Sequence, residues 1–284
     1  MNAPAPRVSV VIPVFNCDRY LGAALGSVLA QTGVDFDVLV SDNASTDRTA
    51  EIVRSFGDER VRYLYSTENV GAVPNWNAGM AQATGEYVKL FHADDLLYDG
   101  CLAKQAAVLD ANPGVALVCG PHDIIDERGR RVMTRGLRRP GVIGGREAVR
   151  MMARRGTNLV GEPSGVMMRA SAYRAAGPFT ERARYVVDLE MWVRLLLEGD
   201  LYVMAETLSA YRIQRGSWSN DLAASQTGDF RALLRQLAAD PRFGVSGTDV
   251  AVGTLGAWRN TKLRRVFYAL YLRGEAPDAK VTDA

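Results

Sequence analysis

The chain contains 284 residues, 48% of them hydrophobic and 23% charged, which is the balance of an ordinary globular protein with one substantial core. Its 34 lysines and arginines nearly cancel its 32 acidic residues, and because the net charge is only +2 we expect no nucleic-acid partner. No apolar stretch has the length of a membrane span, and the short apolar run near the N-terminus lacks the basic start of a signal peptide.

The first 120 residues alternate between strand and helix patterns. Residues 8–14 are an almost unbroken β-branched run, which predicts a strand buried on both faces and therefore a parallel sheet. Residues 18–31 carry apolar side chains at helical spacing. Further strands are predicted at 36–40, 61–65, 86–91 and 115–118, and further helices at 47–56, 73–83 and 99–110. This order predicts an α/β fold with a doubly wound, mostly parallel sheet flanked by helices.

The second half has a different pattern. Residues 120–145 are rich in glycine and arginine, which predicts a loop or a hairpin, before an extended segment at 164–168, a helix at 188–198 and a strand at 201–204. Near the C-terminus, residues 258–273 predict an amphipathic basic helix that packs on the core, forms a dimer contact or rests on a membrane surface. The apolar and basic residues of this helix are Trp258, Leu263, Phe267, Leu270, Tyr271, Arg259, Lys262, Arg264, Arg265 and Arg273.

Polar and aromatic side chains gather at the ends of the predicted strands. In an open parallel sheet, ligands bind at the carboxyl ends of the strands, where loops and helix N-termini converge. The side chains at these ends are Pro13, Phe15, Asn16, Asp42, Asn69, Asp94 and Asp95. Residues 13–17 contain no glycine, which excludes both a dinucleotide-binding turn and a phosphate-binding loop of the Walker type.

Asp94 and Asp95 form an adjacent pair of carboxylates at the end of the fourth strand. Two carboxylates are costly to desolvate together unless a positive charge lies between them and a ligand. Hard oxygen ligands together with diphosphate oxygens are the usual way to hold magnesium or manganese, so both residues are candidate metal ligands. The alternative is a solvated acidic turn that caps the following helix.

Six short motifs, taken together and in this order, resemble the family 2 glycosyltransferases of the GT-A fold over about residues 7–215. The motifs are VSVVIPVFN at 8–16, SDNASTD at 41–47, NVG at 69–71, NWNAG at 75–79, GEY at 85–87 and HADD at 92–95. The resemblance implies a GT-A glycosyltransferase domain at 1–215, with a nucleotide-sugar half at about 1–120 and an acceptor half at 121–215. Residues 216–284 would then form a helical C-terminal extension.

The resemblance also implies roles for individual residues on the donor side. Asp42 would accept a hydrogen bond from the nucleotide base, and Pro13 and Phe15 would line the base pocket. Asp94 and Asp95 would hold ribose and a divalent metal, Mn²⁺ or Mg²⁺. The other residues implied in binding a UDP-, dTDP- or GDP-sugar are Asn16, Asn69, Asn77 and Arg212.

On the acceptor side, the segment YVVDLEMWVR at 185–194 is similar to the one that carries the family's catalytic base, and Asp188 falls on that position. Glu162, which precedes a predicted strand, is a candidate contact to a glycan or lipid-linked glycan acceptor. An exposed surface carboxylate is the alternative for Glu162. For Asp188 the alternative is a helix cap.

Four positions depart from the family pattern. His92 stands where an aspartate is frequent, Trp76 where an arginine often helps to hold the diphosphate, and Val187 where a glutamate usually precedes the base. Gln214 occupies the place of a histidine that commonly supports the diphosphate and the metal. These departures keep a second interpretation open, in which the chain is a catalytically silent module that binds nucleotide-sugars.

The three cysteines, Cys17, Cys101 and Cys119, have no metal-type or redox-type spacing, which favours free thiols in a reducing compartment. We therefore expect a cytoplasmic protein, at most peripheral at the inner face of the membrane. The expected activity is inverting transfer of a sugar from a nucleotide-sugar to an acceptor hydroxyl, in the synthesis of a surface polysaccharide or glycoconjugate. Inversion is implied by the resemblance.

Overall fold

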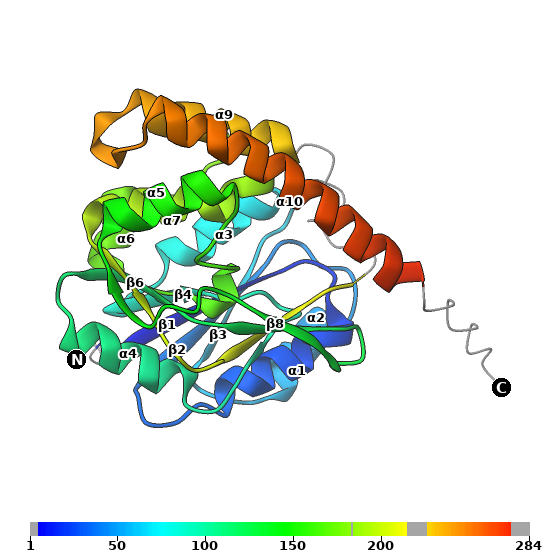
Figure 1. Cartoon of the computed structure of the whole chain (residues 1–284). Helices are drawn as coiled ribbons and strands as arrows, with labels where there is room; N and C mark the ends of the chain where they lie inside the picture. Colours follow the sequence, from blue (N-terminus) through cyan, green and yellow to red (C-terminus); the bar gives the residue numbers. More distant parts are fainter. Residues whose placement is uncertain (1–4, 183, 215–225, 274–284) are drawn as a thin grey trace.

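A mixed eight-stranded sheet runs through the centre of the computed structural model, which describes residues 5–182, 184–214 and 226–273 (Figure 1). Its strand order is β3-β2-β1-β4-β10-β6-β11-β9. The bounds are β1 (Val8–Val14), β2 (Phe36–Asp42), β3 (Val61–Tyr65), β4 (Tyr87–Leu90), β6 (Val115–Cys119), β9 (Gly141–Ile143), β10 (Met167–Arg169) and β11 (Asp200–Val203). The first four strands in this order are parallel, while β10 is antiparallel to β4 and β6, and β9 is antiparallel to β11.

Helices cover both faces of the sheet, as the alternating pattern predicts (Figure 1). Successive residues of β1 point to opposite faces, so Val10 and Ile12 join one apolar cluster while Val11 joins the other. The first cluster packs against α1 (Asp18–Leu29), α2 (Thr49–Ser55) and α4 (Cys101–Ala111). The second packs against α3 (Ala72–Ala81), α5 (Gly145–Arg155), α6 (Ala170–Ala176) and α7 (Val187–Glu198).

A second, four-stranded sheet lies beside the first, with the order β5-β12-β7-β8. Its strands are β5 (Leu96–Leu97), β7 (His122–Ile125), β8 (Arg131–Arg135) and β12 (Ser209–Arg212). The basic segment predicted as a loop or hairpin supplies the antiparallel pair β7 and β8. The carboxylate of Asp126 closes their turn by accepting hydrogen bonds from the backbone of Arg128 and Arg130. This sheet brings β12 next to the residues that follow β4.

Several boundaries differ from the sequence-based expectation. The segment expected to be extended from residue 164 begins with a 3₁₀ turn, η1 (Pro163–Gly165), and the strand follows only at Met167. This turn places the Ser164 hydroxyl within hydrogen-bonding distance of the His92 amide. Among the described helices, none combines the length and the apolar composition needed to cross a membrane.

The C-terminal helices α9 (Gln226–Ala239) and α10 (Gly247–Arg273) pack over the layer of α5 and α7 (Figure 1). Phe230, Leu233 and Leu237 of α9 belong to the same apolar cluster as α5 and α7. The extension therefore shares its core with the first domain along α9. The side chains of residues 264–273, including Phe267, Leu270 and Tyr271 of the expected amphipathic helix, lie outside the described residues.

Glycines allow α10 to cross α5 at backbone distance. A Cβ atom at Gly253 would lie 1.9 Å from the carbonyl oxygen of Ala153, which is fixed in α5. We expect Gly253→Ala to lower stability by about 1–3 kcal/mol, the usual cost of overpacking, measured by urea unfolding. Gly228→Ala in α9 is the matched control, because a Cβ there meets no atom within 4 Å and should be neutral or stabilising. Equal stability of the two variants would show that α10 is not docked in this way.

Candidate active site

The residues that follow β4 and β12 meet at the carboxyl-end edge of the main sheet. Asp94 and Asp95 come from the end of β4, and Arg212 and Gln214 come from the end of β12. The Gln214 amide donates to Oδ2 of Asp94 at 2.8 Å, and the backbone amide of Arg212 donates to Oδ1 of Asp95 at 2.9 Å. The two sheets are thus joined through the acidic pair.

Asp95 is an internal carboxyl group, which corrects the expectation of a surface metal ligand. It is 0% exposed, and besides the Arg212 amide it accepts a hydrogen bond from the Ser164 hydroxyl. Burial, followed by the charge of Asp94, holds its pKa well above the usual range. Because the carboxyl group is fully buried, with both oxygens held by Arg212 and Ser164, we withdraw Asp95 as a metal ligand.

Asp94 is the accessible member of the pair. Its side chain is only partly buried, and the hydrogen bond that Gln214 donates goes to Oδ2 alone. Oδ1 accepts no hydrogen bond from the described residues and remains available to a ligand. Gln214, a departure from the family pattern, therefore still contacts the carboxylate that the pattern requires.

Arg212 is buried and binds the protein backbone. Its Nε donates to the carbonyl oxygen of Asp94 at 2.7 Å, and its Nη1 donates to that of Asp126 at 2.9 Å. The guanidinium also lies 4.6 Å from the ring centroid of Tyr20. Through these contacts Arg212 fixes the backbone that presents Asp94, and its contact to a diphosphate stays a prediction.

Asp42 ends β2 in a buried position. Its Oδ1 accepts a hydrogen bond from the Ser45 amide at 2.8 Å, and its Oδ2 accepts one from the Tyr63 hydroxyl. Each oxygen keeps a second lone pair, which can accept a hydrogen bond from a nucleotide base. That contact stays a prediction. Phe15, in contrast, is 47% exposed at the end of β1, which leaves its ring available for stacking.

The other residues predicted on the donor side hold the protein together. Pro13 is buried within β1, and its expected place in the wall of the base pocket stays a prediction. The side-chain amide of Asn77 donates to the carbonyl oxygen of Phe179 and accepts a hydrogen bond from the Phe179 amide. We therefore withdraw Asn77 as a contact to the nucleotide-sugar. Asn16 accepts a hydrogen bond from the Thr46 amide, and Asn69 accepts one from Asn43. The contacts of Asn16 and Asn69 to a nucleotide-sugar stay predictions.

Asp188 is the second residue of α7 and has the environment of a general base. Its Oδ2 accepts a hydrogen bond from Asn158 at 2.9 Å, and its Oδ1 accepts one from the Leu189 amide at 2.7 Å. Burial, reinforced by the nearby charge of Glu162, raises its pKa to about 7 in spite of these hydrogen bonds. A carboxyl with this pKa exchanges protons near neutral pH.

Asn158 holds the loop next to this carboxyl. Its Nδ2 donates to both the Gly161 carbonyl oxygen and Asp188, while its Oδ1 accepts from the amides of Val160 and Gly161. The indole of Trp192 donates to the same Gly161 carbonyl at 3.0 Å. Asn158 therefore fixes the orientation of Asp188 relative to the chain that leads to Glu162.

Glu162 forms an ion pair instead of standing free on the surface. Its Oε2 lies 2.8 Å from Nε2 of His122 in β7. Burial opposes the charge of Glu162, but the charge of His122 outweighs this effect and lowers the pKa of Glu162 below its usual range. The same pair raises the pKa of His122 against the effect of burial. A fixed negative charge thus lies close to Asp188.

The remaining departures from the family pattern have structural partners. Trp76 is 7% exposed and packs 5.4 Å from the ring of His92 and 5.6 Å, edge on, from Phe179. Trp76 therefore replaces a charge with apolar packing.

Glu190, a second carboxylate near the start of α7, accepts two hydrogen bonds from Arg194. It is therefore a poor alternative to Asp188 as a base.

The raised pKa of Asp188 has a consequence for stability. An unfolded aspartate has a pKa of about 3.9, so the native state binds the extra proton and loses stability as pH rises from about 4 to about 7. Asp188→Asn removes this loss. We expect its melting temperature to exceed that of the wild type by several degrees at pH 8 and to approach it at about pH 5. A difference that does not vary with pH would contradict the environment assigned to Asp188.

Three important partners of these residues were not identified from the sequence. Tyr63 binds Asp42, Asn158 binds Asp188 and His122 binds Glu162, across 21, 30 and 40 positions respectively. Asn158 and Tyr63 belong to none of the motifs. No local signal in the sequence pairs them with their acidic partners, because the pairing depends on the sheet topology.

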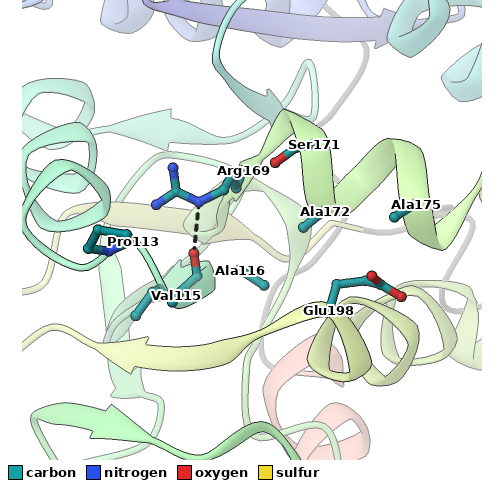
Figure 2. Close-up of a pocket in the computed structure, with 9 residues that line it drawn as sticks. Pro113, Val115, Ala116, Arg169, Ser171, Ala172, Ala175 and Glu198 are labelled. Carbon is teal, nitrogen blue, oxygen red and sulfur yellow. Dashed lines mark hydrogen bonds between the residues drawn. The ribbon is translucent and has the colours of Figure 1, made fainter.

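A shallow pocket lies at the opposite edge of the sheet, where β6 begins. Figure 2 shows that it is lined by Pro113, Arg169 and Glu198, among others. The guanidinium of Arg169 donates to the carbonyl oxygens of Val115 and Leu109 and is therefore occupied within the protein. We regard this pocket as separate from the candidate site.

Comparison with known proteins agrees with this arrangement. The model of the family "Glycosyl transferase family 2" matches residues 9–176. The chain is 28% identical over 239 residues to EpsE of Bacillus subtilis, a provisionally assigned glycosyltransferase, with 78% of this chain and 81% of EpsE covered. It is 27% identical over 253 residues to an uncharacterized glycosyltransferase of Rickettsia typhi, with 87% and 77% covered.

Solved structures share the fold. TarS of S. aureus, in complex with UDP-GlcNAc, superposes with a TM-score of 0.66 at 18% identity and covers 82% of this chain and 66% of its own. The mannosyltransferase PcManGT of Pyrobaculum calidifontis, in complex with GDP-Man and Mn²⁺, gives 0.58 at 17% identity, with 94% and 76% covered. At these identities the likeness establishes a common GT-A architecture.

Proposed function

Since the chain belongs to the family 2 glycosyltransferases, we propose that it moves a sugar from a nucleotide-sugar to an acceptor hydroxyl with inversion at the anomeric carbon. The observation that carries this proposal is the environment of Asp188. A half-buried carboxyl with a pKa of about 7 at the start of α7, oriented by Asn158, suits a general base. This environment also favours an active enzyme over a silent binding module.

In the proposed reaction, Asp188 takes the proton of the acceptor hydroxyl. The oxygen of that hydroxyl then forms a bond to the anomeric carbon from the face opposite the leaving group. The bond between the anomeric carbon and the diphosphate oxygen breaks, and the nucleoside diphosphate leaves with the electron pair. Asn158 keeps Oδ2 of Asp188 in place by its hydrogen bond, which limits the orientations that the carboxylate can adopt.

Phe15 and Asp42 are the proposed contacts to the nucleotide. The exposed ring of Phe15 offers a face on which a base can stack, at the end of the strand next to Asp42. Asp42 is held rigidly by Ser45 and Tyr63, so it would accept one further hydrogen bond without reorganisation. UDP-, dTDP- and GDP-sugars all remain candidate donors, and the structures of TarS and PcManGT show UDP-GlcNAc and GDP-Man bound to those proteins.

We also propose that Asp94 holds a divalent cation, Mn²⁺ or Mg²⁺, together with the donor. Such cations are often bound by one or two carboxylates plus substrate phosphates. The described residues contain no group of three metal-binding side chains, but the available Oδ1 of Asp94 fits a cation shared with a diphosphate. When bound, the cation would neutralise the charge that develops on the leaving diphosphate.

For the acceptor we propose a glycan or lipid-linked glycan, used at the cytoplasmic face of the membrane in surface polysaccharide or glycoconjugate synthesis. The support is the likeness to EpsE and the group of polar side chains formed by Glu162, its ion-pair partner His122 and the nearby Asp188. Glu162, already paired with His122, can accept a further hydrogen bond from a sugar hydroxyl.

The experiment that tests the function combines binding and turnover. Purified full-length protein is incubated with UDP-, dTDP- and GDP-sugars, with and without Mn²⁺, and both thermal stabilisation and release of the nucleoside diphosphate are measured. The proposal expects one class of donor to stabilise the protein and to be slowly hydrolysed. Stabilisation without any hydrolysis by the wild type, at any metal concentration or pH, would favour a silent binding module.

A further inference from the structure

The outward side of α10 carries an unusual concentration of exposed apolar side chains. Among the described residues, ten large hydrophobic side chains are exposed, and four of them lie on this helix. Leu255 is 68% exposed and Leu263 is 61% exposed. We define the outer face of α10 by its exposed apolar and basic residues, which are Val252, Leu255, Trp258, Arg259, Lys262 and Leu263.

These six residues form one continuous stripe. At 100° per residue they fall within an arc of about 140° of the helix circumference. The opposite side of the helix packs against α5 and the residue that follows it, through Gly253 and the buried Ala257, while Gly256 contacts α5 at the flank. The helix therefore has one side docked on the protein and one apolar side turned away from it. Patches of this kind mark an interaction surface.

The charges of the stripe have one sign. Arg259 and Lys262 lie among its apolar residues, and Nζ of Lys262 is 5.8 Å from the ring centroid of Trp258. Asp249 is the single acidic residue in the sequence of α10, and it is 1% exposed and bound to Arg150 and Ser246. No exposed acid thus offsets the two cations on the described part of this face.

We propose that the outer face of α10 binds the surface of a membrane that contains anionic lipids. Trp258, Leu255 and Leu263 would enter the boundary between headgroups and acyl chains, where tryptophan and leucine side chains are favoured. Arg259 and Lys262 would stay at the level of the phosphates, where the negative surface potential of the leaflet attracts cationic side chains.

A second copy of the chain is a poorer occupant of this face. A two-fold contact is made by the same patch on both subunits, so Arg259 and Lys262 of one copy would approach those of the other. Like charges placed together cost energy, and charged residues are depleted from the cores of protein interfaces. An anionic lipid surface satisfies both the apolar and the charged residues.

Vesicle binding by the full-length protein tests this proposal independently of the proposed reaction. The probes are vesicles of phosphatidylcholine alone and of phosphatidylcholine with phosphatidylglycerol, and binding is measured by co-sedimentation. We compare the wild type with Leu255→Ser/Trp258→Ser/Leu263→Ser and with Arg259→Glu/Lys262→Glu. The matched control is Met133→Ser/Val142→Ser, which removes exposed apolar side chains from a different surface.

We expect the wild type and the control to bind the anionic vesicles, and this binding should weaken as salt is added. Both α10 variants should bind the same vesicles with an affinity at least about tenfold lower. Circular dichroism should show that the variants are folded, since they change only exposed side chains. Absence of wild-type binding to anionic vesicles, or equal binding by all four proteins, would overturn the proposal. A wild-type dimer that the serine variant converts to a monomer would overturn it as well.

Discussion

Asp188→Asn should lower the turnover of sugar transfer by on the order of a hundredfold or more, while donor affinity stays nearly unchanged. The asparagine has almost the same shape and can still accept the hydrogen bond from the Leu189 amide. It cannot accept a proton from the acceptor hydroxyl, and its NH₂ group replaces the oxygen that accepts from Asn158, so both changes lower the rate of the chemical step and leave the nucleotide contacts in place. Turnover and donor affinity are measured separately, by product release at saturating substrates and by calorimetry.

The Asn158→Ala variant provides a second test of the same carboxylate. Loss of Asn158 leaves Asp188 ionisable but removes the donor to Oδ2, so we expect a smaller fall in turnover and a shifted pH profile. Glu190→Gln is the control, because Glu190 is engaged with Arg194 and should not affect the pH profile. Wild-type turnover by Asp188→Asn would remove Asp188 as the base, and Glu162 would be the next candidate.

Asp94→Asn should abolish the contribution of Mn²⁺ or Mg²⁺ to donor binding. Loss of a charged contact of this kind costs about 1.5–3 kcal/mol, which is roughly tenfold to a hundredfold in affinity. The asparagine can still accept the hydrogen bond from Gln214, so the local structure is maintained. Titration of a nucleoside diphosphate with and without metal measures the effect, and metal-free binding should not change.

Asp95→Asn is the matched control for this measurement. Asp95 is buried with a strongly raised pKa, so a neutral side chain of the same shape should preserve metal-dependent binding. The two adjacent variants therefore have opposite expected outcomes. If Asp95→Asn loses the metal dependence and Asp94→Asn keeps it, the assignment of the accessible carboxylate is wrong.

The sequence predicted the part of the fold in which each strand is buried on both faces. Residues 8–14 are an almost unbroken apolar run, four of the residues at 36–40 are apolar, and this pattern favours a central parallel sheet. The second sheet escaped prediction because β5 has two residues and β7 and β12 contain polar side chains. His122 and Arg212 are buried there only because Glu162 and the backbone at Asp94 and Asp126 pair with them.

The sequence motifs predicted which residues lie near the candidate site, but they did not predict the role of each residue. Motif order placed Asp42, Asp94 and Asp188 at strand and helix ends, where the structure finds them. It could not distinguish Asp94 from Asp95, since the difference is set by the Arg212 amide, 117 positions away. Nor could it show that Pro13, Asn77 and Arg212 would be used inside the protein.

The pH dependence of transfer at saturating donor and metal directly tests whether Asp188 is the base of a sugar transfer. Because the base must be ionised, we expect turnover to rise about tenfold per pH unit below a pKa of about 7 and to become constant above it. A turnover that stays constant from pH 5.5 to pH 8 in the wild type would show that Asp188 is not the base.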